Sequence, residues 1–119
     1  MSSEEGRSGY GLGQEVARRR ELTAVFCAND QMALGLLRAL SEAGLQVPGD
    51  VSVVGFDDIP EAAYLIPPLT TVRQDFTAVG HRAIEILQAA IAGEPAPERL
   101  IGPELVVRAS TAAPGARNE

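Results

Sequence analysis

The sequence contains no lysine and no tryptophan, and it has one cysteine and one histidine. The absence of lysine excludes Schiff-base chemistry and the lysine of a phosphate-binding P-loop. A single cysteine, Cys27, excludes a disulfide within the chain. No apolar run approaches the roughly 18 residues of a membrane span, and the first ten residues lack a signal-peptide hydrophobic stretch. We therefore expect a soluble, cytoplasmic chain with no membrane partner.

Positive charge is also scarce, since the net charge is -6 and the isoelectric point is near 4.7. This balance argues against a nucleic-acid surface within these residues. The run Arg18–Arg20 stands between Glu15 and Glu21, which favours a solvated helix end over a phosphate-binding patch. At 119 residues, the chain is long enough for one domain that buries roughly two thirds of its unfolded surface.

A strand, a helix and a second strand are predicted between Thr23 and Phe56. Residues 23–27 and 51–56 are short, β-favouring apolar runs, as in strands whose sheet is covered on both faces. Residues 31–44 between them place apolar side chains at helical spacing, and Gly44 stands where a left-handed residue ends a helix. This spacing is typical of a right-handed βαβ unit with parallel strands.

Less regular segments flank this unit. We expect a frayed start over residues 1–9, a helix over residues 12–22 and a short helix that begins at Pro60. A third strand is predicted at 69–72, a helix from Asp75 to Ala92, and a late strand at 103–111. The late strand alternates Leu105, Val107 and Ala109 with Glu104, Val106 and Arg108, and residues 112–119 resemble a disordered tail.

Two of the predicted strands end in adjacent polar residues, Asn29-Asp30 and Asp57-Asp58. Open parallel sheets bind ligands outside the carboxyl ends of their strands, so these residues are candidate ligand contacts. Asp30 and Asp58 have an alternative role as helix N-caps. That role leaves Asn29 and Asp57 unexplained and directed toward the crevice.

Enzymatic roles fit these residues poorly. Adjacent side chains diverge in an extended chain, so Asp57 and Asp58 do not form a facing acid–base pair. His81 lies away from the apolar face of its helix, and Cys27 has no histidine beside it in the sequence. The glycines near Gly9 follow no strand, unlike a dinucleotide-binding fingerprint. We predict no catalytic residue, no metal and no cofactor.

The segments "ANDQMALG", "VSVVGFDD" and "PPLTTVRQDF", in this order between Leu22 and Thr111, resemble the C-terminal part of LacI/GalR-family bacterial transcription regulators. The resemblance implies an α/β fold, a three-layer parallel-sheet lobe of the periplasmic-binding-protein-like fold. It also implies a sugar or similar small effector bound between two lobes, and a homodimer.

The resemblance assigns roles to eight residues. The effector-binding residues that it implies are Asn29, Asp57, Gln74 and Phe76. The dimer-interface residues that it implies are Met32, Leu34, Tyr64 and Leu65. Asn29 and Asp57 are the two residues that the capping argument leaves unexplained.

Relative to that family, these 119 residues lack a helix-turn-helix headpiece, a hinge helix and the first half of the effector domain. Residues 1–111 would form a partial effector-binding and dimerisation domain, with the Asp75 to Ala92 helix belonging to the other lobe. Operator DNA would be bound only through the absent headpiece, and exposed apolar surfaces would be covered by self-association. The alternatives are a fragment of a transporter's sugar-binding protein and a pure oligomerisation module.

Overall fold

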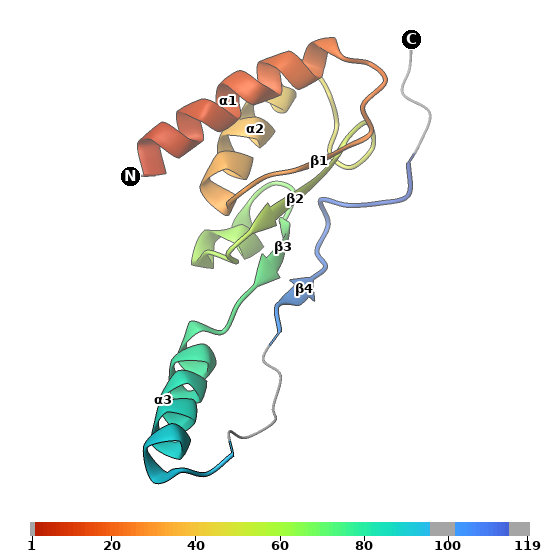
Figure 1. Ribbon diagram of the computed structural model, residues 1–119. Helices are drawn as coiled ribbons and strands as arrows, with labels where there is room; N and C mark the ends of the chain where they lie inside the picture. Colours follow the sequence, from red (N-terminus) through yellow and green to blue (C-terminus); the bar gives the residue numbers. More distant parts are fainter. Residues whose placement is uncertain (1, 96–101, 115–119) are drawn as a thin grey trace. The chain divides into compact units, whose positions relative to one another are not determined.

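The computed structural model describes residues 2–95 and 102–114 and contains four helical segments and four strands (Figure 1). In chain order these are α1 (Ser2–Arg18), β1 (Ala24–Phe26), α2 (Asp30–Glu42), β2 (Ser52–Phe56), the 3₁₀ helix η1 (Pro60–Tyr64), β3 (Thr70–Arg73), α3 (Phe76–Ala92) and β4 (Glu104–Val106). The chain divides into a first unit, residues 1–73 with 105–119, and a second unit, residues 74–104. No helix in the described ranges is long and apolar enough to cross a membrane.

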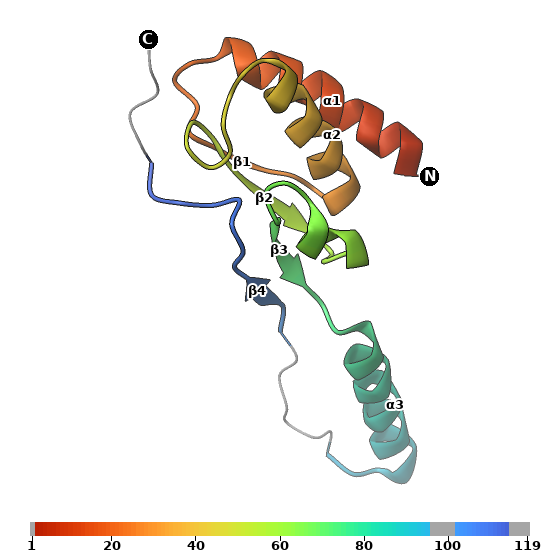
Figure 2. The same ribbon diagram turned by 180° about the vertical axis from the view of Figure 1, so that it is seen from behind.

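The predicted frayed start is wrong, because α1 begins at Ser2 and runs to Arg18. This helix contains four glycines, and each glycine costs an isolated helix about 1 kcal/mol relative to alanine. Helices of this kind are stabilised mainly by packing rather than by propensity. The relevant packing is against α2, which runs beside α1 in both front and rear views (Figures 1 and 2).

Glycines allow α1 and α2 to approach at backbone distance. A Cβ at Gly9 would stand 1.9 Å from the Met32 carbonyl oxygen, and one at Gly35 would stand 1.9 Å from the Gly6 carbonyl oxygen. Neither position has room for a larger residue, since real Cβ atoms do not approach within 3.0 Å of such atoms. The glycine-rich stretch is therefore a helix-packing surface. The sequence had predicted a frayed start over the first of these glycines and had excluded a dinucleotide-binding fingerprint near Gly9.

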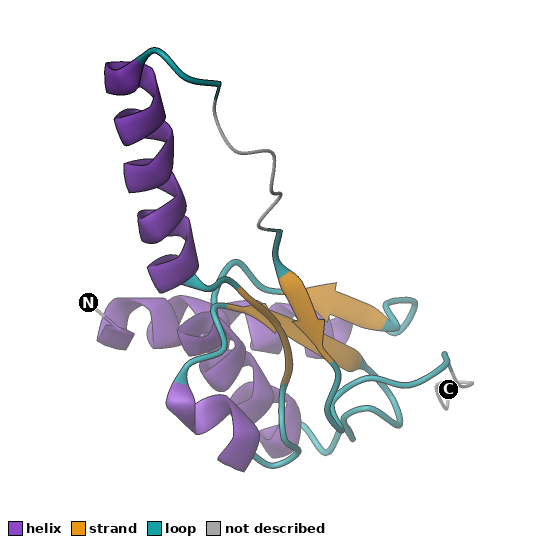
Figure 3. Ribbon diagram, turned by 90° about the horizontal axis from the view of Figure 1, so that it is seen from below, coloured by secondary structure: helices purple, strands orange, loops and turns teal. Residues whose placement is uncertain are grey.

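The predicted βαβ unit is confirmed. β1 pairs with β2 and β2 pairs with β3, both in parallel, within a sheet of order β1-β2-β3-β4. Figure 3 shows the strands of this sheet in orange. Asn29 caps α2 with its side chain, and Gly44, just beyond the helix, has a φ of 79° as its position predicted. An α/β fold with a mostly parallel sheet is thus established.

The core of the first unit lies between α2 and the sheet. It is built from aliphatic side chains on the inner face of α2, on β2 and the residue before it, on η1 and on the segment before β3, joined by Cys27. The fully buried members, with at most 1% of their surface exposed, are Cys27, Ala33, Leu36, Leu40, Val51, Val53, Ala62 and Leu69. The predicted core role of Cys27 is confirmed, and burial raises the pKa of its thiol to about 11.

Residues after β4 return to the sheet through hydrogen bonds. The Ser110 hydroxyl donates to the Val53 carbonyl oxygen over 2.5 Å and accepts from the Thr70 amide over 2.8 Å. Ser110 is buried, whereas Leu105 and Val107 are 59% and 68% exposed. The apolar set of the predicted alternation is therefore the exposed one. Ser110, which is shielded from solvent, makes the hydrogen bonds to β2 and β3.

The predicted tail contains a residue that pairs with the sheet. The Ala112 amide donates to the Ser52 hydroxyl over 3.1 Å, and this hydroxyl lies 3.2 Å from the Ala112 carbonyl oxygen. Ordered contacts of the first unit therefore continue to Ala112. Residues 115–119 of the predicted tail lie outside the described residues.

The second unit consists mainly of α3. Asp75 caps the helix by accepting from the Ala78 amide over 3.0 Å, and Gly93 ends it with a φ of 73°. Both ends agree with the prediction for the Asp75 to Ala92 helix. No residue of α3 is buried, so the apolar face that revealed the helix is exposed.

Candidate functional site

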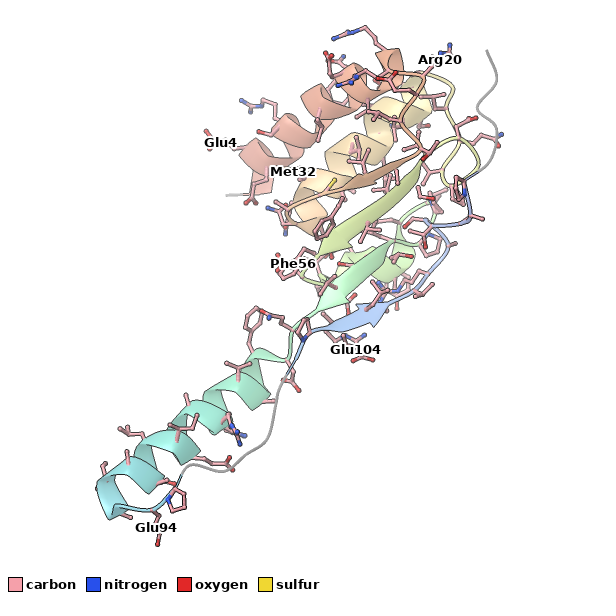
Figure 4. The ribbon with its side chains drawn as sticks, turned by 45° about the vertical axis from the view of Figure 1, so that its right-hand side comes forward. Glu4, Arg20, Met32, Phe56, Glu94 and Glu104 are labelled. Carbon is pink, nitrogen blue, oxygen red and sulfur yellow. The ribbon has the colours of Figure 1, made fainter. Side chains whose placement is uncertain are left out.

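The carboxyl ends of β1 and β2 meet at one edge of the sheet. Phe26 pairs with Val54, and three further residues along each strand lead to Asn29 and Asp57. Figure 4 shows the labelled Phe56, the neighbour of Asp57, and Met32, in the first turn after Asn29, at the same end of the first unit. The two strand-end residues singled out by the sequence therefore belong to one edge, which we call the strand-end site.

The alternative capping roles are wrong for both Asp30 and Asp58. The N-cap of α2 is Asn29, whose Oδ1 accepts from the Met32 amide over 2.8 Å. The N-cap position of η1 is Ile59, which makes no side-chain capping hydrogen bond. Asn29, one position before Asp30, has the extended backbone of a capping residue, and its side chain reaches the amide three residues later.

Asp30 is instead a buried structural group with no exposed surface. Its Oδ1 accepts from the Thr71 hydroxyl over 2.7 Å, and its Oδ2 accepts from the Ile59 amide over 2.9 Å. A buried carboxylate is tolerated when its oxygens are hydrogen-bonded in this way. Asp30 ties α2 to β3 and to the loop after β2, immediately behind the strand-end site.

Glu5 of α1 also belongs to the strand-end site, although sequence reasoning missed it. Its Oε2 accepts from Asn29 Nδ2 over 3.1 Å, and its Oε1 is buried without a hydrogen-bond partner among the described residues. Glu5 was placed in the expected frayed start, so no sequence signal pointed to it. The close packing of α1 on α2 brings it to Asn29.

Asp57 is half-buried, and the surrounding charges act on it. Burial raises the pKa of its carboxyl, and the negative charges of Asp30 and Glu5 raise that pKa further. The site thus concentrates acceptor oxygens of Asp57 and Glu5 beside one remaining amide N–H of Asn29. Such a set is best matched by a ligand that offers hydrogen-bond donors.

Asp58 faces two arginines. Its Oδ2 accepts from Arg73 Nε over 2.8 Å, and its Oδ1 lies 2.9 Å from Arg108 Nη2. Burial by itself would raise the pKa of Asp58, but the hydrogen bonds and positive charges of the two arginines outweigh it and hold the pKa below its usual range. Asp58 is thus an ion-pair centre.

The other two predicted effector residues, Gln74 and Phe76, belong to the second unit. Gln74 is half-buried, and Phe76 is 65% exposed at the first position of α3. The structure therefore brings Asn29 and Asp57 together within one unit. The roles of Gln74 and Phe76 in the same site stay predictions.

Three of the four predicted dimer residues, all except Met32, line a shallow groove between α2 and η1, which is formed by Leu34, Leu37, Arg38, Ser41, Tyr64, Leu65 and Ile66. Leu34 is 46% exposed and Tyr64 is 84% exposed. Met32 and Leu65 are half-buried and pack against the core. Most of the exposed apolar area among the four predicted residues therefore comes from Leu34 and Tyr64. Their role in a dimer stays a prediction.

Two other side chains with catalytic potential are His81 and Cys27. His81 is exposed on α3, and Cys27 is buried in the core. In residues 2–95 and 102–114, no group of three or more histidine, cysteine, aspartate or glutamate side chains is arranged to hold a metal ion. The acidic groups at the sheet edge fit ligand recognition better than proton transfer, since Asp58 is neutralised by arginines.

A parallel sheet with hydrogen-bonding residues at the carboxyl ends of its strands defines one lobe of an α/β ligand-binding protein. Residues 3–111 match the periplasmic binding protein-like domain, and the chain belongs to that family. It resembles the C-terminal part of the effector-binding domain of LacI-family regulators, as its motifs predicted.

The chain is 57% identical over 101 residues to the helix-turn-helix transcriptional regulator MalR of Streptomyces coelicolor, which covers 82% of this chain and 29% of MalR. A lac repressor dimer bound to operator and an anti-inducer superposes with a TM-score of 0.75 at 39% identity, covering 88% of this chain and 37% of the repressor. A LacI-family regulator of Arthrobacter in complex with lactose gives a TM-score of 0.73 at 33% identity, covering 90% and 42%. The chain therefore spans less than a third of the length of MalR.

Proposed function

We propose that this chain is the ligand-sensing and dimerisation part of a LacI-type transcription regulator, and that it binds a sugar or similar small effector. The observation that carries the proposal is the strand-end site, where Asn29 and Asp57 follow paired parallel strands. Relatives that regulate transcription support a binding role rather than an enzymatic one. Operator DNA would be bound through a headpiece outside these residues, and the cytoplasm is the expected location.

The chemistry of the site favours an uncharged effector rich in hydroxyl groups. Asp57 accepts no side-chain hydrogen bond from the described residues, and Glu5 keeps one buried oxygen unpartnered. Hydroxyl groups donate to carboxylate oxygens in short, charge-assisted bonds that fix the orientation of a sugar. A phosphorylated sugar would be repelled by the same carboxylates, whose mutual repulsion already contributes to the raised pKa of Asp57.

Amide chemical shifts of this chain in a lactose titration test the proposal. Lactose should shift the Asn29 and Asp57 amides, with weak affinity because only part of a two-lobed site is present. Glucose 6-phosphate at the same concentration should shift them much less. The matched control is Asp50→Asn, which changes a carboxylate in the loop before β2; it should leave lactose binding unchanged. Asp57→Asn should abolish the shifts, and unchanged affinity in Asp57→Asn would contradict the site.

For dimerisation, we propose the groove between α2 and η1 as the twofold contact. An exposed apolar patch of this kind is typical of a protein–protein interface, and a twofold dimer uses the same patch on both copies. Leu34→Glu should convert the dimer to a monomer in sedimentation velocity. Leu87→Glu, on the exposed face of α3, is the control. If only Leu87→Glu dissociates the dimer, the contact lies on α3 and the proposed groove is wrong.

Two alternatives remain to be compared with this proposal. A solute-binding protein of a transporter shares the fold, but the relatives described above are transcription regulators, which favours the regulator. An oligomerisation module would form a stable dimer and show no shifts with neutral sugars, sugar phosphates or nucleosides. The lactose titration therefore separates the oligomerisation module from the two functions that require sugar binding.

A further inference from the structure

The two adjacent aspartates after β2 form an unusual turn. Asp57 has a φ of 125° and Asp58 has a φ of 58°, and both values lie in the left-handed region that favours glycine. Two consecutive non-glycine residues in that region are strained, and such strain persists only where surrounding contacts enforce it. The turn directs the side chain of Asp57 at the strand-end site, so the contacts that enforce it also position Asp57.

Backbone contacts supply the first part of this enforcement. The Asp57 amide donates to the Val72 carbonyl oxygen over 2.8 Å, and the Asp58 amide donates to the Thr71 hydroxyl over 3.3 Å. The next amide, at Ile59, donates to buried Asp30 over 2.9 Å. Three successive amides are therefore held by β3 and α2.

The carboxylate of Asp58 supplies the second part, through its two arginines. Arg73 is the last residue of the first unit before the chain enters the second unit, and Arg108 follows shortly after the chain returns at residue 105. Arg108 also donates from Nη1 to the Leu69 carbonyl oxygen over 2.9 Å. Its side chain is only 17% exposed, and that of Asp58 is 11% exposed, so solvent screens this pair less than a surface ion pair.

We propose that Asp58 is a positioning residue that locks the Asp57 turn to both chain segments that connect the two units. This inference rests on the proposed function for the role of Asp57, and it adds a mechanical role for the second aspartate. An effector that binds Asp57 would contact this turn. Asp58 connects the turn by ion pairs to Arg73 on the outgoing segment and to Arg108 on the returning one.

Amide hydrogen exchange in the full chain without ligand tests the lock. Two amides report on its two sides: Asp57, bonded to Val72, and residue 108, bonded to the Thr70 hydroxyl over 2.8 Å. Asp58→Asn should raise exchange at both amides by about tenfold, because a charge-assisted contact is lost. The control Glu61→Gln, an exposed acid three residues further on, should change neither.

Arg108→Lys separates position from charge and gives a milder variant in case Asp58→Asn does not fold. Lysine keeps the charge but loses the planar fork that reaches both Asp58 and Leu69. It should alter the three-bond coupling that reports φ at Asp57 and Asp58, while the amides of α1 keep their exchange rates. If both variants leave the couplings and the two exchange rates as in the parent chain, the lock does not exist.

Lactose titration of the same variants completes the experiment. If the parent chain binds lactose, Arg108→Lys should weaken binding although Asp57 is unchanged, and equal affinity would overturn the positioning role. If the parent chain binds no sugar, the proposed function fails. The exchange and coupling measurements then still decide whether Asp58 locks the turn.

Discussion

Helices α2 and α3 have the same kind of apolar face, but the face of α2 is buried and that of α3 is exposed. α2 has 13 residues and buries six of them, whereas α3 has 17 residues and buries none. The inner face of α2 contacts the sheet and α1. The face of α3 that carries Phe76, Val79, Ile84, Leu87 and Ile91 is exposed, each side chain by 44% or more.

This contrast shows that periodicity predicts a helix but not the surface that covers it. An amphipathic helix gains little stability until its apolar face is buried. The structure shows this for α3, whose apolar face contains no buried residue. The following predictions compare α2 and α3 by matched substitutions.

The largest difference is expected for leucine truncation. Leu40→Ala on α2 should reduce the free energy of unfolding by about 2–5 kcal/mol, because it leaves a cavity in a fully buried site. Leu87→Ala on α3, at a site that is 60% exposed, should change it by no more than about 0.5 kcal/mol. Urea unfolding followed by circular dichroism measures both values. A similar loss in the two variants would show that α3 is covered in solution.

Glycine substitution should give the next largest difference. Gly35→Ala on α2 would place its Cβ 1.9 Å from the Gly6 carbonyl oxygen and should cost about 1–3 kcal/mol as the helices separate. Gly80→Ala on α3 has nothing within 4 Å and should stabilise that helix by up to about 1 kcal/mol. Thermal melts and amide exchange of each helix report the opposite signs. Destabilisation by Gly80→Ala would contradict an open α3.

The two helix caps should differ by a smaller amount. Asp75→Ala removes a cap from α3 and should increase exchange of its first-turn amides, consistent with a loss of about 1 kcal/mol. Asn29→Ala removes the α2 cap and also the hydrogen bond to Glu5, so its cost should be greater. Asn29→Asp keeps the cap acceptor, but it loses the donor to Glu5 and places a second negative charge beside it, so it should also be less stable than the parent chain. If Asn29→Asp is as stable as the parent chain, the Glu5 contact contributes nothing.

The smallest effect concerns pH and is confined to the first unit. The lowered pKa of Asp58 stabilises the folded state above the ordinary aspartate pKa of about 3.9, and this contribution is lost as pH falls through the lowered value. The raised pKa of Asp57 acts with the opposite sign, since its ionised form is disfavoured in the folded state. The stability difference between the parent chain and Asp58→Asn should therefore shrink between pH 5 and pH 2, as urea titrations at each pH would show. A constant difference would contradict the ion pairs.

The sequence predicted the parts of the fold in which the local residue pattern agrees with the tertiary packing. The βαβ unit, Gly44 and Gly93 beyond helix ends, and buried Cys27 were all predicted correctly. These features depend on residues close in the chain, namely caps, left-handed glycines and apolar runs.

The candidate site was predicted only in part. Asn29 and Asp57 were singled out because strand ends share an edge in a parallel sheet. Glu5 was missed because its position depends on the packing of a glycine-rich helix, which propensity alone predicts to be unstable. Asp30 and Asp58 had been considered as helix caps, but the structure pairs them with Thr71, Arg73 and Arg108 instead. These partners are distant in the sequence, so no local pattern could reveal them.

The sequence by itself therefore determined the elements of the βαβ unit, their parallel order and the strand end at which "VSVVGFDDIP" becomes polar, but not the start of α1. Tertiary structure decided what each aspartate does there. Asp57 was left as an acceptor at the sheet edge, while Asp58 was neutralised by arginines from β3 and from the segment after β4. The physical reason is that alternation along a chain fixes only the face of a side chain. The charge that a carboxylate meets on that face depends on segments brought there by folding.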